Sequence, residues 1–291
     1  MGKISDMVKR NRVLISDGAW GTSLQQKGLL AGECPEEWNI SHRSDVLEIA
    51  RNYIYAGSDM IQTNSFGGSR FKLAHYGLDS KAEEINRAAA EISREAAGDK
   101  LVIASLGPTG KILMMGDVSE EQLYEGFREQ AVALEAGGAD AACIETMAAL
   151  DEALCAVKAV QENTNLEIIC TFTFDKTSAG DFRTMMGVSP SSMTTALIEA
   201  GAEIIGSNCG NGMEQMICIV KEIRNTSSDI PVLIHANAGL PVVKDGNNTF
   251  PETPEDMAGL APKLAEVGAN IIGGCCGTTP AHIAAIAGAV Q

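Results

Sequence analysis

Short apolar runs rich in β-branched residues recur along the whole sequence, and segments with helical periodicity lie between them. Eight such runs are present: Val13–Ser16, Met60–Thr63, Leu101–Ser105, Ala141–Glu145, Ile168–Phe172, Glu203–Gly206, Val232–His235 and Asn270–Gly273. Strands that alternate with helices pair in parallel and are joined by right-handed crossovers. The pattern therefore predicts a parallel α/β architecture.

The helical segments carry clear start and stop signals. In Lys81–Ala97 the apolar residues recur every three or four positions and form one stripe, opposite a charged face. Ser-Pro at 189–190 and Thr-Pro at 253–254 and 279–280 combine an N-cap residue with a proline in the first helical turn. These pairs predict helix starts after the fifth, seventh and eighth strands.

A weak internal repeat accompanies the alternation. Glycine and a small residue precede Asp, Glu or Asn at four places: Ala56–Asp59, Gly138–Asp140, Gly201–Glu203 and Gly268–Asn270. Glycine is the usual residue where a helix ends. Each copy therefore marks a helix that turns into the next strand.

Eight βα units without a linker-like stretch predict one domain, residues 1–291, folded as a closed (β/α)8 TIM barrel with parallel strands. The alternative is a doubly wound open sheet, which usually carries GxGxxG after an early strand. The segment Asp17–Thr22 lacks that spacing. We expect Gln26–Arg43 to form an elaborated loop over one end of the barrel.

Charge and hydropathy exclude several classes of partner. The net charge of −16 argues against binding to nucleic acid or to an anionic membrane, since both need a basic surface. No segment approaches the roughly 18 apolar residues of a membrane span, and no secretory signal is present. Eight irregularly spaced cysteines fit a reducing compartment. We therefore expect a cytoplasmic protein.

Two adjacent cysteines, Cys275 and Cys276, lie between glycines just before a predicted helix start. Neighbouring cysteines rarely form a disulfide, because its geometry does not suit an ordinary trans peptide. Flanking glycines let the backbone turn both side chains toward one point. Two small core residues would be the plainer interpretation. Cys209, which has a similar Gly-rich setting, favours a site built from three thiolates.

Catalytic residues of such barrels collect at the C-terminal ends of the strands. The polar and thiol residues at these ends are Asp17, Asn64, Glu145, Cys209, Asn237, Cys275 and Cys276. Three thiolates suit Zn²⁺ and leave a fourth position open for substrate. Because a tris-thiolate zinc is a poor Lewis acid for water, a thiol substrate matches it best.

The chain resembles the homocysteine S-methyltransferase family, whose members use methylcobalamin, betaine or S-methylmethionine. The resemblance rests on six motifs in order: Asp17–Thr22, Thr63–Phe66, Ile144–Thr146, Gly206–Gly210, Asn237–Gly239 and Gly273–Thr278. It implies a zinc barrel that transfers a methyl group to the thiolate of L-homocysteine and yields methionine.

The same resemblance assigns roles to single residues. Cys209, Cys275 and Cys276 would hold the zinc ion and so form the catalytic centre. Glu145 and Asp17 would accept hydrogen bonds from the substrate ammonium. The substrate carboxylate would bind the backbone N–H groups of Gly18 and Ala19. Asn64 would also bind substrate, and Asn237 would ligate zinc in its absence or support the ligands.

Purely structural roles compete with several of these assignments. Asp17 could be a turn former before glycine, and Asn64 could cap the end of its strand. Glu145 ends a buried apolar run, where an acid has a weaker structural explanation. His235, inside the seventh strand, is expected to be a hydrogen-bonded core histidine rather than a ligand.

The methyl donor is the least constrained part of the prediction. Gly32–Asn39 resembles the corrinoid-linked branch of the family, which implies methylcobalamin on a separate corrinoid protein, since the chain ends at Gln291 without cobalamin or folate domains. Trp20 stands where the family has a small residue or methionine. It could narrow donor access or stack on a cationic methyl donor, which keeps S-methylmethionine and betaine open.

Two other classes of function remain open. One is a non-catalytic homocysteine-binding module of a larger methyltransferase complex. The other is a thiol redox or metal-storage protein, although the CxxC motif expected of a redox protein is absent from the sequence.

Overall fold

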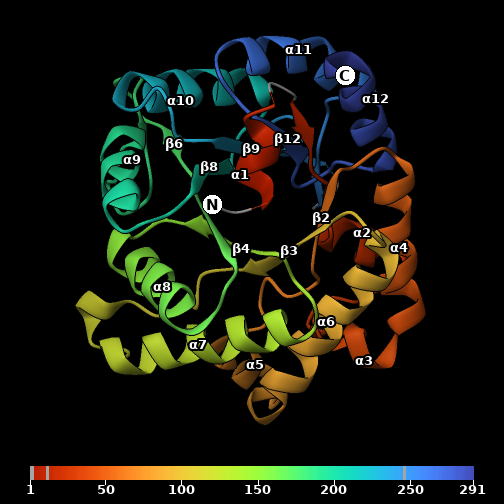
Figure 1. Cartoon of the computed structure of the whole chain (residues 1–291). Coiled ribbons are helices and arrows are strands. Elements are labelled where there is room, and N and C mark those ends of the chain that lie inside the picture. Colours follow the sequence, from red (N-terminus) through yellow and green to blue (C-terminus); the bar gives the residue numbers. More distant parts are fainter. Residues whose placement is uncertain (1–2, 11–12, 245–246) are drawn as a thin grey trace.

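A computed structural model describes residues 3–10, 13–244 and 247–291. Eight parallel strands form a nearly closed barrel surrounded by helices, with the strand order β1-β12-β9-β8-β5-β4-β3-β2 (Figure 1). The strands are β1 (Leu14–Ile15), β2 (Met60–Gln62), β3 (Leu101–Leu106), β4 (Ala141–Met147), β5 (Glu167–Phe172), β8 (Ile204–Asn208), β9 (Val232–Ala236) and β12 (Ile271–Gly274). The predicted (β/α)8 barrel is confirmed, and all eight predicted strands are present.

Helices cover the outside of the barrel. The helices after the first are α2 (Gly21–Gln26), α3 (Trp38–Ser41), α4 (Arg43–Tyr55), α5 (Arg70–Leu73), α6 (Ala82–Ala97), α7 (Glu120–Ala136), α8 (Leu150–Asn163), α9 (Pro190–Glu199), α10 (Met213–Thr226), α11 (Pro254–Glu266) and α12 (Pro280–Val290). Of these, α2 lies at the mouth, where Gly21, Thr22 and Leu24 line a cavity. The predicted starts are confirmed, because Ser189, Thr253 and Thr279 are N-caps with a capping box. No helix in the described part of the chain is long and apolar enough to span a membrane.

Several loop elements were not predicted. Short 3-10 turns occur at Ala74–Tyr76, Asp79–Lys81 and Leu113–Met115, and the expected loop after Gln26 contains α3. Two antiparallel hairpins follow the ends of β5 and β9: β6 (Asp175–Lys176) with β7 (Phe182–Arg183), and β10 (Val242–Lys244) with β11 (Asn247–Thr249). These hairpins extend the loops at the C-terminal end of the barrel, which we call the mouth.

The internal repeat has a structural explanation in the pairing of successive strands. Its four glycines, Gly57, Gly138, Gly201 and Gly268, have φ angles of 102°, 103°, 91° and 110°, a region that favours glycine. The polar residue that follows bonds twice to one residue of the preceding strand. Asp140, for example, donates its N–H to Val102 O at 2.8 Å and accepts from Val102 N at 3.0 Å.

The other three copies make the same pair of bonds. Asp59 bonds to Ile15, Glu203 to Ile168 and Asn270 to Val232, and in each case the side-chain oxygen accepts the backbone N–H at 2.9 Å. The barrel is therefore four repeated strand pairs. The contact of Asp59 with Ile15 brings the two terminal strands of the sheet, β2 and β1, together.

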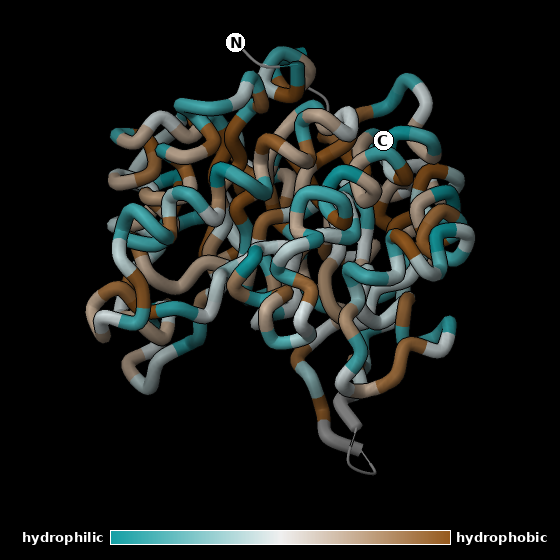
Figure 2. The backbone as a smooth tube through the Cα atoms, turned by 90° about the horizontal axis from the view of Figure 1, so that it is seen from below, coloured by the Kyte–Doolittle hydropathy of each residue, from teal (hydrophilic) through white to brown (hydrophobic). Residues whose placement is uncertain are grey.

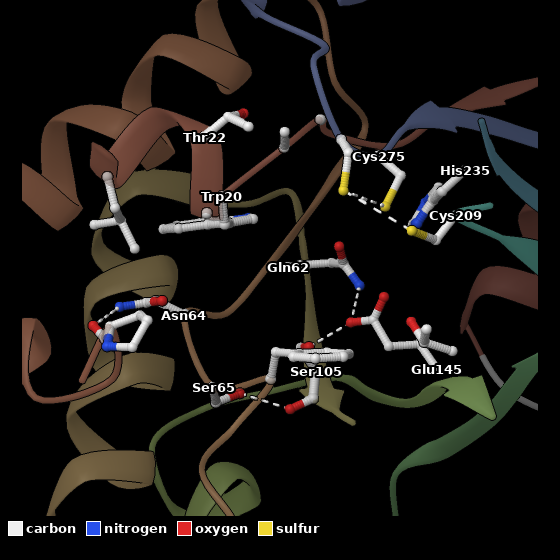
Figure 3. Close-up of a pocket in the computed structure, with 18 of the residues that line it drawn as sticks. Trp20, Thr22, Gln62, Asn64, Ser65, Ser105, Glu145, Cys209, His235 and Cys275 are labelled. Atoms are coloured by element: carbon white, nitrogen blue, oxygen red, sulfur yellow. Dashed lines mark hydrogen bonds between the residues drawn. The ribbon is translucent and has the colours of Figure 1, made fainter. Parts of the chain in front are cut away.

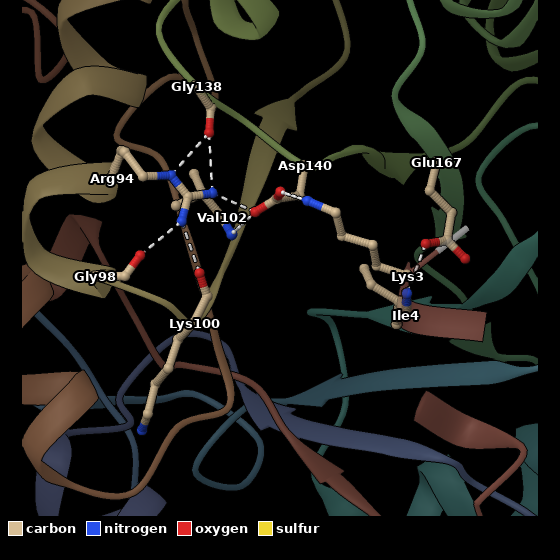
Figure 4. A network of polar contacts seen from close by, with 9 residues as sticks. All are labelled: Lys3, Ile4, Arg94, Gly98, Lys100, Val102, Gly138, Asp140 and Glu167. Carbon is tan, nitrogen blue, oxygen red and sulfur yellow. Dashed lines mark hydrogen bonds and ion pairs between the residues drawn. The ribbon is translucent and has the colours of Figure 1, made fainter. Parts of the chain in front are cut away.

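The opposite end of the barrel is closed by α1 (Lys3–Val8), near the N-terminus (Figures 1 and 2). Ile4 is fully buried in a cluster with apolar residues of all eight strands. Glu167 accepts hydrogen bonds from Ile4 N and Ser5 N, each at 2.8 Å, and Lys3 pairs with Asp140 at 2.7 Å (Figure 4). With this end plugged, access to the barrel interior is from the mouth.

Candidate active site

Three cysteines meet at the mouth of the barrel. Cys209 directly follows β8, and Cys275 and Cys276 directly follow β12, two strands away in the sheet. The Cys209 and Cys276 sulfurs are 3.8 Å apart, those of Cys275 and Cys276 are 4.0 Å apart, and all three lie within 4.8 Å of one another (Figure 3). The expectation that the sixth and eighth strands bring these thiols together is confirmed.

Strand β9 lies between the two cysteine segments and fixes both through its backbone. Cys209 N donates to His235 O at 3.0 Å, and Cys275 N donates to Ala236 O at 2.7 Å. Cys209 itself has a φ of 60°, and Gly210 after it has a φ of 70°. A left-handed conformation is rare for a residue other than glycine. The chain therefore makes a sharp, constrained turn at the position that presents the Cys209 sulfur.

The donor set fits a tetrahedral thiolate-binding metal ion. Zn–S bonds of 2.3 Å in a tetrahedral site place the sulfurs about 3.8 Å apart, close to the separations of 3.8 and 4.0 Å. Hydrogen bonding to Cys209 and Cys276, with burial, raises the pKa of Cys275 well above its usual value. Three thiolates therefore need a positive charge to coexist here.

Asn237 lies beside this cluster, as expected. Its side chain hydrogen-bonds to the Cys209 sulfur, which helps to lower the pKa of that thiol after the larger effects of the two neighbouring cysteines. Its Oδ1 atom is buried and has no hydrogen-bond partner among the described residues. An oxygen acceptor is thus left available next to the sulfurs.

Glu145 supplies a carboxylate to the same cavity. Its Oε1 atom accepts a hydrogen bond from Gln62 Nε2 at 2.8 Å and another from the Ser105 hydroxyl (Figure 3). Asn208 Nδ2 lies 3.4 Å from Oε2. Burial raises the pKa of Glu145 to about 7, because a low-dielectric environment disfavours the charged form.

Asn208 links the carboxylate to the thiol cluster. It directly precedes Cys209, and its Oδ1 accepts hydrogen bonds from Thr146 N at 2.8 Å and Thr171 Oγ1 at 2.7 Å. Its Nδ2 atom donates to Thr146 Oγ1 at 2.7 Å. Because Thr146 directly follows Glu145, one amide side chain fixes the position of both functional segments.

The three cysteines, Glu145 and Thr146 line one cavity of about 300 Å³. The thiols form one part of its wall, and Gln62, Ser105 and Glu145 form another (Figure 3). The remaining wall includes Gly18, Ala19, Trp20, Asn64, Phe66 and His235. Pro35 and Glu36 also contribute, so the segment Gln26–Arg43 does reach the mouth as expected.

Asp17 is placed differently from the expectation, since its side chain is fully buried and does not line the cavity. Its Oδ2 atom accepts hydrogen bonds from Trp20 Nε1 and Gln62 N, each at 2.8 Å, and Oδ1 accepts from Ser16 Oγ at 3.2 Å. Burial raises the pKa of Asp17 to about 6. The indole of Trp20 contributes to the cavity wall in its place.

Gly18 and Ala19 line the cavity where a substrate carboxylate was expected. A Cβ atom on Gly18 would lie only 2.7 Å from Thr278 Oγ1 and 2.9 Å from Tyr53 Cε1, so the backbone approach requires glycine. The N–H of Ala19 already donates to Thr278 Oγ1 at 3.1 Å. A carboxylate bound by Ala19 would have to replace that bond.

Asn64 has a structural role at the end of its strand, which was the alternative to substrate binding. Its Nδ2 atom donates to Pro35 O at 2.8 Å and Asn39 Oδ1 at 3.1 Å, and Asn39 Nδ2 donates back to Asn64 O at 2.8 Å. These bonds tie the loop before α3 to the end of β2. Asn64 also lines the cavity, so contact with a ligand stays a prediction.

Sequence reasoning missed several cavity residues. Gln62 and Ser105 are polar residues in otherwise apolar strands, a signal that could have identified them.

His235 was expected to be fully hydrogen-bonded, but its buried Nε2 atom has no partner among the described residues. It lies beside Cys209 (Figure 3), and burial lowers its pKa to about 4, so the ring is neutral near pH 7.

Comparisons with known proteins agree with this geometry. The sequence profile described as "Homocysteine S-methyltransferase" matches residues 14–290. The methionine synthases of Mycobacterium tuberculosis and Mycobacterium leprae are each 32% identical, over 97% and 96% of this chain. The chain spans about a quarter of the length of these relatives, 25% and 24%.

Solved structures show the same fold at lower identity. The metallated homocysteine methyltransferase MmuM from Escherichia coli superposes with a TM-score of 0.79 at 22% identity, covering 97% of this chain and 98% of that one. The carboxyl transferase domain of Rhizobium etli pyruvate carboxylase reaches 0.58 at 16% identity, covering 98% of this chain and 48% of that one. At these identities the likeness establishes the fold alone.

Proposed function

Because the chain belongs to the homocysteine S-methyltransferase family, we propose that residues 1–291 form a homocysteine-binding domain that methylates the sulfur of L-homocysteine to give methionine. One observation carries the proposal. Three thiol sulfurs and the Glu145 carboxylate line a single cavity of about 300 Å³. A small molecule with a thiol and an ammonium group can therefore meet both.

Zn²⁺ would be held by Cys209, Cys275 and Cys276. The reducing environment of the cytoplasm would keep these thiols from forming disulfides. When bound, the ion would supply the positive charge that keeps a substrate thiol ionised near neutral pH. Asn237 supports Cys209 through a side-chain hydrogen bond. Glu145, held by Gln62, accepts the substrate ammonium.

The transfer itself is a displacement at the methyl carbon. The substrate thiol loses its proton, and the sulfur forms a bond to the methyl group as the bond between that group and its donor breaks. The bonding electron pair leaves with the donor. The residues of the chain contribute by orienting the sulfur and by excluding water from the cavity. Helix α1 closes the opposite end of the barrel.

As donor we propose methylcobalamin carried by a separate corrinoid protein. The resemblance of Gly32–Asn39 to the corrinoid-linked branch supports this proposal. A second candidate is a small cationic donor such as S-methylmethionine or betaine. It is favoured by the indole of Trp20 in the cavity wall, where a cation can bind an aromatic face.

The proposed centre is tested by metal content and homocysteine affinity. We expect one zinc ion per chain, and we expect Cys209→Ser to lose both the zinc and homocysteine binding, because a weaker oxygen ligand replaces a thiolate. Cys218→Ser is the matched control, since Cys218 is exposed on α10. Full zinc content in Cys209→Ser, or no metal in the native protein, would contradict the proposal.

A further inference from the structure

Trp20 separates a buried carboxylate from the cavity. Its indole lines the cavity, while its Nε1–H group donates to Asp17 Oδ2 at 2.8 Å behind that wall. The Asp17 side chain is fully buried. Of the two acidic side chains expected to bind the ammonium group, only Glu145 therefore lines the cavity (Figure 3).

Asp17 nevertheless acts on Glu145 through Gln62. Asp17 Oδ2 accepts the backbone N–H of Gln62 at 2.8 Å, and the Gln62 side chain donates to Glu145 Oε1 at 2.8 Å. Ser93 Oγ holds the carbonyl of Gln62 at 2.9 Å. Gln62 is thus fixed at both backbone polar groups, so that its amide is aimed at Glu145.

Releasing Asp17 to a ligand would be costly. Its Oδ2 atom already accepts two N–H groups, and a move toward the cavity would leave the Trp20 indole N–H or the buried Gln62 N–H without a partner. Leaving a buried N–H group unpaired raises the free energy of the protein by about as much as a strong new hydrogen bond to the ligand would lower it. The arrangement therefore favours an Asp17 that stays behind the indole when substrate is bound.

We propose that Trp20 is a specificity-determining residue that keeps Asp17 out of the cavity, so that of these two carboxylates only Glu145 receives the substrate ammonium and Asp17 acts as a positioning residue. This inference rests on the proposed homocysteine-binding function. It also specifies that function, because an ammonium site without Asp17 depends on the Gln62 and Ser105 contacts that hold the Glu145 carboxylate in place.

Calorimetry with two ligands distinguishes a side chain that contacts the substrate ammonium from one that only positions Glu145. L-homocysteine and 4-mercaptobutanoate share the thiol and the carboxylate, but only the first has an ammonium group, so the ratio of their dissociation constants reports ammonium recognition. For the zinc-loaded protein we expect Glu145→Gln to reduce that preference at least about tenfold, as expected for a lost buried charge contact. We expect Asp17→Asn to weaken the binding of both ligands by a similar factor. The ratio of their dissociation constants should then stay within about threefold of the native ratio.

Loss of the preference in Asp17→Asn would overturn the inference, because Asp17 would then contact the ammonium. Failure of the native protein to bind either ligand would instead contradict the proposed function. The two failures are therefore distinguishable.

A second measurement needs no change at Asp17. The chain has only two tryptophans, so the indole N–H signal of Trp20 in an NMR spectrum is identified by its persistence in Trp38→Phe. We expect this signal to keep its hydrogen-bonded shift and slow exchange when homocysteine binds. An upfield shift and faster exchange with homocysteine, but not with 4-mercaptobutanoate, would show Asp17 released to the ammonium and overturn the inference.

Discussion

Thr146 and Cys209 have φ angles of 61° and 60°, and no other non-glycine residue in the described ranges has a positive φ. Both line the cavity, and Thr146 directly follows Glu145. Such conformations persist only where neighbouring contacts enforce them, as Asn208 does for Thr146 through two hydrogen bonds. Backbone strain thus identifies the same site as the chemistry of its side chains.

The raised pKa of Glu145 predicts how amino-acid binding depends on pH. Methionine is the useful ligand, because it has an ammonium group but no thiol to ionise. Since burial raises the pKa of Glu145 to about 7, the carboxyl is protonated below that pH and must lose its proton before it accepts an ammonium. We expect the affinity for methionine, measured by calorimetry, to rise by up to about tenfold per pH unit below pH 7 and to level off above it.

Glu145→Gln provides the control for this pH profile. It keeps the shape of the side chain and removes the ionisation, so the rise around pH 7 should disappear together with most of the affinity. A native protein whose methionine affinity does not change across this range would show that Glu145 does not receive the ammonium.

Single residues differ in how far the sequence predicts them. The three cysteines were predictable because few other roles explain adjacent thiols among glycines. The position of Asp17 was not, since it depends on a hydrogen bond from Trp20 that only the folded chain makes. The environment of the His235 ring was not predictable either, because it depends on packing. The buried Nε2 atom has no partner among the described residues, and the ring lies so close to Gly273 that a Cβ there would be 2.8 Å from His235 Cδ2.

At the level of elements, the repeated turns show what a local pattern can and cannot predict. The glycines marked helix ends correctly. The side-chain bridges that follow them join residues 35 to 44 positions apart, so no local pattern contains them. Arg94 and Arg224 extend the repeat, because each donates to the carbonyl of the turn glycine 44 residues ahead, Gly138 and Gly268.

The bridge at Asp140 can be tested by substitution. Asp140→Ala removes the acceptor of Val102 N and the partner of Arg94 and Lys3. We expect it to lower the free energy of unfolding, measured with urea, by about 1–3 kcal/mol, because a buried backbone N–H loses its partner. Asp140→Asn should retain most of the stability, since Asn270 makes the equivalent bond with an amide oxygen.

Asp117→Ala is the matched control for this comparison. Asp117 is exposed, so its loss should change the free energy of unfolding by less than about 0.5 kcal/mol. Equal destabilisation by Asp140→Ala and Asp140→Asn would mean that charge pairing, rather than the backbone bridge, stabilises this end of the barrel.

At the scale of the whole molecule, the barrel has a plugged end and an open end. The alternation of eight strands with helices was sufficient to predict the closed sheet. It did not predict the plug, because α1 has only six residues and is held by the distant Glu167. The cavity could not be predicted from the sequence either, since its walls come from the ends of several strands that meet only when the barrel closes.

The size of the cavity bears on the methyl donor. About 300 Å³ lies at the low end of the range for small-molecule sites, roughly 300–1,000 Å³, so the cavity has room for the amino acid and little more. A corrinoid would have to present its methyl group from outside the mouth. A small sulfonium or ammonium donor would have to share the cavity with homocysteine beside Trp20.

These arrangements are distinguished by supplying homocysteine with methylcobalamin, S-methylmethionine, betaine or methyltetrahydrofolate in parallel and measuring methionine. We expect methylcobalamin to support methionine formation, and Cys209→Ser to abolish it while Cys218→Ser does not. Methionine from a small cationic donor alone would contradict the corrinoid assignment and favour stacking on Trp20. Homocysteine binding without methionine from any donor would identify the chain as a non-catalytic binding module, because the thiol and ammonium sites would then be intact without a route for the methyl group.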